Sequence, residues 1–160
     1  MFDGRIKNGA MWALKQTRYP NHIVWAVNAS PADTNLDFAD TASIERGCSF
    51  IGNIRLSDDV LIGTGSHLEG NVDVGRGTYL VRDDEVIGNI SIGNFCAIAR
   101  DTTIQARDHL STRPSMQMRF YDNYLNSSLP HVDKGETTIG SDVWVGTNSI
   151  ILSGVRSEER

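Results

Sequence analysis

Bulky apolar residues recur at every sixth position over the central part of this chain. The repeating positions are Phe38, Ile44, Phe50, Leu56, Ile62, Leu68, Val74, Leu80, Val86, Ile92, Ile98, Ile104 and Leu110. A helix repeats about every 3.6 residues and a strand every two, so neither element alone explains a period of six. Hexapeptide repeats are typical of a parallel β-helix, in which each short strand forms one side of a coil and successive coils stack. The pattern therefore predicts an all-β parallel β-helix.

The repeat region also contains an internal copy of itself. Residues 50–56 (FIGNIRL) match residues 86–92 (VIGNISI) at an offset of 36 positions. If three six-residue sides complete one coil, this offset equals two coils, and equivalent residues stack on the same side. Glycine often follows the inward apolar residue, as at Gly63, Gly75 and Gly93. We expect these glycines at corners between strands, where residues that tolerate unusual φ angles are favoured.

The pattern divides a single domain of 160 residues into segments. These are an N-terminal cap or lead-in (1–37), the coils (38–110), a loop insertion (111–137), a closing coil (138–155) and a polar tail (156–160). Within the cap we expect an amphipathic helix or irregular stretch over 1–20, a strand at 23–27 and a loop at 28–37. The period resumes at Ile139, Val145 and Ile151 in the closing coil.

The loop insertion is unusually long and unusually apolar. Loops of this length in a compact domain are generally functional or disordered. Its apolar residues are Met116, Met118, Phe120, Tyr121, Tyr124, Leu125 and Leu129. A disordered segment would be poorer in aromatic residues, so we expect the insertion to pack against another surface.

Charge and hydropathy exclude several classes of protein. The net charge is −5 at pH 7, without a long run of one sign, which argues against a nucleic-acid partner. The apolar stretches are only a few residues long, so we expect no membrane span. The first 20 residues contain no apolar run of signal-peptide length, and we therefore expect a cytoplasmic protein.

The cysteines and histidines are too far apart on the predicted coils to act together. Cys48 and Cys96 each follow an inward apolar residue by four positions, so both are interpreted as packing residues. They are separated by two coils and two-thirds of a turn, which predicts no disulfide and no cysteine nucleophile. Of the four histidines, His67 and His109 are separated by two coils and one side, so they share no corner. We expect no metal site.

Two stretches near the C-terminal end carry more specific motifs. Residues 137–155 contain Ile-Gly, then a Trp-Val-Gly step, then an apolar run that ends in Gly-Val. Residues 92–98 have the form Ile-Gly-x-Phe-Cys-x-Ile. Together they resemble the hexapeptide-repeat acyltransferase family, in particular its xenobiotic (streptogramin) acetyltransferase and sugar O-acetyltransferase branch. The chain differs in having Ser153 where the family usually has proline.

The resemblance implies a left-handed β-helix that assembles as a homotrimer, with active sites between neighbouring subunits. His109, which lies where the coils lead into the insertion, matches the catalytic histidine. It would act as the general base, because its unperturbed pKa lies near neutrality. Asp108 and Asp101 are alternative acids to orient it.

The same resemblance assigns binding residues. Trp144 matches the tryptophan beside the pantetheine arm of acetyl-CoA, and Gly146 and Thr147 match positions whose main chain approaches the cofactor. Trp144 could equally be a packing residue on the coil exterior. The loop residues Phe120, Tyr121 and Tyr124 would contact the acceptor substrate or the next subunit.

The expected function is transfer of an acetyl group from acetyl-CoA to a hydroxyl of a sugar or small natural product, with an amine as the alternative acceptor. Members of the family continue with further coils after the Gly-Val step, which complete the coenzyme A groove. The first alternative is therefore a non-catalytic β-helix scaffold without that groove. The second is a zinc-dependent hexapeptide-repeat enzyme such as a carbonic anhydrase, which the histidine spacing opposes.

Overall fold

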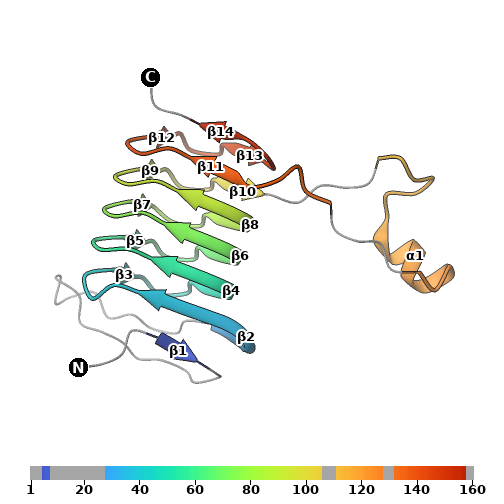
Figure 1. Cartoon of the computed structure of the whole chain (residues 1–160), viewed down its shortest axis with the longest axis horizontal. Helices are drawn as coiled ribbons and strands as arrows, with labels where there is room; N and C mark the ends of the chain where they lie inside the picture. Colours follow the sequence, from blue (N-terminus) through green and yellow to red (C-terminus); the bar gives the residue numbers. More distant parts are fainter. Residues whose placement is uncertain (1–4, 8–27, 106–110, 128–131, 158–160) are drawn as a thin grey trace.

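The computed structural model describes residues 5–7, 28–105, 111–127 and 132–157 (Figure 1). The regular structure of the described chain is almost entirely β-strand. The strands are β1 (Arg5–Lys7), β2 (Asn28–Phe38), β3 (Ser43–Ile44), β4 (Ser49–Leu56), β5 (Leu61–Ile62), β6 (His67–Val74), β7 (Tyr79–Leu80), β8 (Glu85–Ile92), β9 (Ala97–Ile98), β10 (Thr103–Gln105), β11 (Thr137–Ile139), β12 (Trp144–Val145), β13 (Ile150–Leu152) and β14 (Arg156–Ser157). The insertion contains one helix, α1 (Met118–Tyr124).

The strands stack as parallel coils (Figure 1). One sheet has the order β1-β2-β4-β6-β8-β10-β13, and a second has the order β12-β9-β7-β5-β3. Successive coils pair at an offset of 18 residues, as between Phe50 and Leu68 and between Leu68 and Val86. The predicted all-β parallel β-helix is confirmed. The left-handed sense of the coils stays a prediction.

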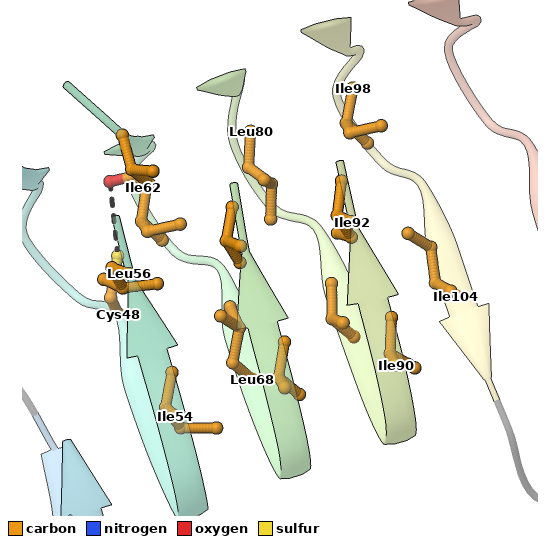
Figure 2. Close-up of a cluster of buried hydrophobic side chains, with 14 of the residues drawn as sticks. Cys48, Ile54, Leu56, Ile62, Leu68, Leu80, Ile90, Ile92, Ile98 and Ile104 are labelled. Carbon is orange, nitrogen blue, oxygen red and sulfur yellow. Dashed lines mark hydrogen bonds between the residues drawn. The ribbon is translucent and has the colours of Figure 1, made fainter. Parts of the chain in front are cut away.

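The inward positions of the six-residue pattern form the core. From Phe50 to Ile104, each of these side chains is at most 2 % exposed. Figure 2 shows apolar side chains from successive coils gathered between the strands, among them Leu56, Leu68 and Ile92. Each fully buried side chain of this size contributes about 1.5–3 kcal/mol through the hydrophobic effect. Phe38 and Ile151 pack against the core at its two ends while partly exposed, and Leu110 lies outside the described residues.

Both cysteines lie in the core, which confirms their interpretation as packing residues. Neither is in a disulfide, and each thiol donates to a carbonyl of the next coil, Cys48 to Gly63 (3.2 Å) and Cys96 to Gly140 (3.0 Å). Burial raises the pKa of the Cys48 thiol to about 11. Its thiolate, the nucleophilic form, is therefore disfavoured.

The first coil begins earlier than the sequence pattern suggested. Residues 28–37 were expected as a loop, but they belong to β2, which pairs in parallel with β4 from Thr34 to Phe38. Arg5–Lys7, expected in a helix or irregular stretch, form β1 and pair antiparallel with β2. Strand β1 thereby occupies the edge of β2 that would otherwise offer unpaired backbone groups. The strand expected at 23–27 lies outside the described residues.

The insertion leaves the β-helix at one corner and returns at the same corner. Strand β8 covers two sides of its coil, and its two halves pair with different strands of the next coil. Its first half, Glu85–Ile87, pairs with β10, and its second half, Ile90–Ile92, pairs with β11. The chain between β10 and β11 therefore replaces the corner that Gly88 and Asn89 form in β8. The following coil resumes normal stacking, because β13 pairs with β10 and β14 with β11.

The part of the insertion from 111 to 127, here called the arm, stands away from the stacked coils (Figure 1). Its helix α1 begins at the cap residue Gln117, whose side chain accepts a hydrogen bond from the Arg119 N–H (3.2 Å). Tyr121 is the buried residue of α1, and its hydroxyl accepts a hydrogen bond from the Ser115 N–H (3.2 Å). No helix in the described ranges is long and apolar enough to cross a bilayer.

Glycines allow the backbones of neighbouring coils to approach closely at the corners. Gly63 was expected to need an unusual φ angle, but the left-handed region is instead occupied by Gly65. Space explains Gly63, because a Cβ there would overlap the Val81 carbonyl oxygen. Gly70 combines both constraints: its φ is +106° and a Cβ would overlap the Gly88 carbonyl oxygen. The coil contact at this corner therefore requires glycine.

We predict that Gly70→Ala lowers the free energy of unfolding by about 2–4 kcal/mol, because the new Cβ meets a rigid backbone in a strained conformation. Chemical denaturation followed by circular dichroism measures the change. Gly146→Ala is the matched control, since the nearest atom to its Cβ, Ser149 Oγ, would lie 3.9 Å away. Equal stability of the two variants would show that the coils can separate at the Gly70 corner without cost.

Candidate functional site

The closing coil presents the predicted cofactor residues along one continuous stretch. Trp144 begins β12 and is 77 % exposed, so it lies on the exterior and packs little within the single chain. The Gly146 carbonyl accepts a hydrogen bond from Ser149 Oγ (2.7 Å), which stabilises the turn after β12. Thr147 follows in this turn with an exposed side chain, and Asn148 next to it has a φ of +58°. The turn thus presents Trp144 and the Gly146–Thr147 backbone on the same coil.

Strand stacking places Trp144 in a column with two other residues. Ala97 on β9 pairs with both Tyr79 on β7 and Trp144 on β12. Tyr79 is 41 % exposed, so two accessible aromatic rings flank the small Ala97 side chain. We refer to Tyr79, Ala97 and Trp144 as the aromatic column. The column combines two exposed aromatic side chains with a small side chain between them.

The arm carries the predicted substrate residues, and α1 brings them together. The Phe120 ring meets the Tyr121 ring edge-on, with centroids 5.4 Å apart, and lies 5.8 Å from the Tyr124 ring. Phe120 and Tyr124 are exposed, as are Met116 and Leu125 beside them. Within one chain, α1 stands apart from β12 (Figure 1), so the arm residues and the cofactor residues form two separate groups.

Of the predicted base and its two candidate acid partners, the structure describes only one acid. His109 and Asp108 lie outside the described residues. Asp101 is described at the corner before β10, with a φ of +57° and its carboxylate 3.8 Å from the Arg100 guanidinium. Among the residues that the structure describes, no group of three or more His, Cys, Asp or Glu side chains is arranged to hold a metal ion.

An acidic corner lies on the coils below the closing coil. It borders an open cavity of about 380 Å³. The lining residues are Gly65, His67, Asp83, Asp84, Glu85, Asp101 and Thr103. Two of the carboxylates face nearby cations, Asp83 with Arg82 at 4.0 Å and Asp101 with Arg100 at 3.8 Å. These pairs are half exposed and hence weak, so the corner keeps a negative potential.

Asp84 is the unusual member of this corner, because it occupies an inward position of its coil. The side chain is 1 % exposed. One oxygen, Oδ1, accepts a hydrogen bond from the Thr102 N–H (3.0 Å), whereas Oδ2 has no partner among the described residues. Burial raises the pKa of the Asp84 carboxyl to about 6, with smaller contributions from the charges of Asp101 and Asp83. The ionised form is therefore costly in the folded state.

Asp84 was not among the predicted site residues, although the six-residue pattern contains a signal for it. Asp84 follows the inward Leu80 by four positions, the same spacing that identified Cys48 and Cys96 as packing residues. A charged residue in a packing position is a recognised pointer to an unusual site.

Neither the protein-family models, nor the curated proteins, nor the solved structures contain a match to this chain. The class of protein is therefore defined by the fold, a parallel β-helix of hexapeptide repeats.

We predict that Asp84→Asn stabilises the protein at pH 7–8 by about 1–3 kcal/mol, because the amide keeps the acceptor for Thr102 without a buried charge. The folded-state pKa of about 6 exceeds the ordinary value of 3.8. The native carboxyl therefore stabilises the fold below about pH 4, and this contribution is lost as the pH rises through 6.

Denaturant midpoints measured from pH 4 to pH 8 test this prediction. The stability difference between Asp84→Asn and the native protein should be small at pH 4 and reach its maximum above pH 6. Asp59→Asn is the control, since Asp59 is an exposed corner residue with a φ of +57°. A difference that does not vary with pH would contradict the buried charge as the cause.

Proposed function

We propose that this protein is an acetyltransferase that moves an acetyl group from acetyl-CoA to a hydroxyl of a sugar or small natural product. The aromatic column supports cofactor binding most directly. The pantetheine arm is a thin, mostly apolar chain, and the exposed rings of Tyr79 and Trp144 on either side of Ala97 offer it a contact surface. The core does not need an exposed tryptophan on β12, so the Trp144 side chain is available for binding.

A positive charge close to this surface favours the phosphate groups of the cofactor. Arg100 occupies the corner one coil below Thr147, as the hydrogen bond from the Asn148 N–H to the Arg100 carbonyl indicates (3.2 Å). Its side chain is 52 % exposed, and its contact with Asp101 is long and solvated. Such a pair contributes little energy, so the guanidinium can turn toward a phosphate at small cost.

The chemistry requires a base for the acceptor. His109 would accept the proton of the acceptor hydroxyl as the oxygen attacks the acetyl thioester carbonyl. The new C–O bond forms, the C–S bond breaks, and the coenzyme A thiol leaves. In the sequence, His109 follows the end of β10 (Gln105) by four residues and precedes the insertion at residues 111–137.

The proposal includes a homotrimer, which the exposed apolar residues of the arm support. Tyr124 is 78 % exposed and Leu125 54 %, although both lie in an ordered segment with a helix. Single exposed apolar residues are ordinary, but a group of them on a projecting arm is typical of an interaction surface. A neighbouring subunit would cover the arm and bring Phe120, Tyr121 and Tyr124 close to its aromatic column.

We predict that acetyl-CoA binds at one site per subunit of a trimer, and that Trp144→Ala weakens this binding about tenfold or more through loss of apolar contact. Titration calorimetry measures the affinity, and light scattering of the same sample gives the mass. Phe95→Ala is the matched control, because Phe95 is also an exposed aromatic residue but lies outside the aromatic column.

An acceptor screen with the native protein and His109→Ala tests catalysis. The variant should lose at least about a hundredfold in rate while binding acetyl-CoA normally, since only proton transfer is removed. A well-folded trimer that does not bind acetyl-CoA would contradict the proposal and favour the scaffold alternative.

A further inference from the structure

Ser49, His67 and Glu69 form a connected group on adjacent coils, away from the aromatic column. Ser49 Oγ lies 2.6 Å from His67 Nδ1, and His67 Nε2 lies 3.3 Å from Glu69 Oε2. A hydroxyl, an imidazole and a carboxylate in this order are the components of an activated nucleophile. We propose that Ser49 is the nucleophile of a second site, which takes an acyl group from small, positively charged thioesters or activated esters.

The β-helix holds these side chains in fixed positions. Ser49 begins β4 and His67 begins β6, and the two residues are paired in the parallel ladder. Glu69 lies two residues after His67, so both side chains emerge on the same face of β6. The His67 and Glu69 side chains are only 26 % and 24 % exposed. The backbone register therefore sets the geometry of the group. Little side-chain conformational entropy is lost when its hydrogen bonds form.

The hydrogen bonds define which ring nitrogen carries the proton. An ionised carboxylate only accepts, so His67 Nε2–H donates to Glu69. Nδ1 is then the acceptor for the Ser49 hydroxyl in the neutral ring. This is the arrangement in which His67 can remove the serine proton, while Glu69 stabilises the imidazolium that results.

The acidic corner defines the charge of the acyl donor. His67 lines the cavity of about 380 Å³ together with Asp83, Glu85 and Asp101. Carboxylates around a cavity raise the local concentration of cations and lower that of anions. Acetyl-CoA carries several negative charges and is disfavoured here, so this site differs in donor from the proposed acetyltransferase site.

The backbone N–H groups of Ser49 and His67 determine how readily the leaving group of the donor must depart. The Ser49 N–H donates to the Ser66 carbonyl (3.0 Å) and the His67 N–H donates to the Asp84 carbonyl (2.8 Å). Because both N–H groups are used by the coil stacking, neither stabilises an oxyanion. Donors must therefore have a leaving group that departs readily, such as a thiolate or a phenolate.

Ser49 and His67 account for every bond change and proton transfer in the proposed reaction. Ser49 Oγ attacks the carbonyl carbon as its proton moves to His67 Nδ1, and the C–O bond to serine forms. The C–S bond of the thioester then breaks, and the proton on Nδ1 passes to the departing thiolate. Water can release the acyl group as a carboxylic acid by the same proton route in reverse.

The experiment uses acetylthiocholine as the probe and its uncharged carbon analogue, 3,3-dimethylbutyl thioacetate, as the matched neutral donor. Mass spectrometry of the digested full-length protein locates the acetyl group, and release of thiol gives the rate. We expect acetylation at Ser49, with the charged donor roughly tenfold faster than the neutral one. Equal rates for the two donors would overturn the assignment of a cationic donor.

Two variants separate activation from simple exposure. Ser49→Ala should reduce thiol release at least about tenfold, whereas Ser43→Ala, a half-buried serine at the start of β3, should not. Thermal unfolding confirms that both variants are folded. An unchanged rate in Ser49→Ala, or acetylation at another residue, would overturn the proposal.

Glu69 is tested as a positioning residue. Glu69→Gln keeps the shape but can donate to Nε2, which would place the ring proton on Nδ1 and remove the base. We expect the rate to fall at least about tenfold without loss of thermal stability. Nitrogen NMR of the His67 ring gives a direct check, with the proton on Nε2 in the native protein. A native ring protonated on Nδ1 would overturn the proposed proton route.

Discussion

The structure depends on one constraint, the parallel backbone ladder that stacks each coil on the coil before it, at an offset of 18 residues from β4 to β8. The ladder fixes the separation of the coils, and the coil corners must then accommodate close backbone approach. Gly52, Gly70 and Gly88 meet this requirement. Any other residue at these positions would press its Cβ against the next coil or adopt a strained φ. The same ladder turns isolated side chains into columns, as in the hydrogen bond from Asn71 to Asn89 (3.0 Å).

The sequence predicted the core because burial of an apolar side chain leaves a periodic trace. It did not predict β2, since Thr34–Phe38 contains little of the six-residue pattern. Leu36, however, is 1 % exposed and lies 18 residues before Ile54, so the coil offset carries the missing signal. Asp84 was missed for a different reason. Periodicity identifies an inward position, whereas the cost of an ionised group there depends on whether hydrogen-bond partners exist in three dimensions.

The candidate acetyltransferase site was predictable only in part, because it is divided between two kinds of structure. Trp144, Gly146 and Thr147 follow the coil register, and their positions come with the fold. Phe120, Tyr121 and Tyr124 belong to an arm whose internal contacts are local, and its register relative to the coils follows no repeat. The insertion replaces a single corner between β10 and β11. Its surface is therefore free to vary without disturbing the ladder, which suits a segment that contacts a substrate or a second subunit.

Column geometry also determines which polar contacts carry chemistry. Many side-chain contacts in this fold join residues 18 apart, such as Arg55 with Asp73, and on an exposed face these pairs add little stability. Ser49 and His67 have the same spacing and would be equally ordinary as a pair. Glu69 makes the difference, because the strand period of two brings a carboxylate to the opposite ring nitrogen of His67. The coil period supplies the nucleophile and its base, and the strand period supplies the group that orients the base. The proposed nucleophile Ser49 therefore lies where the coil period and the strand period meet at His67.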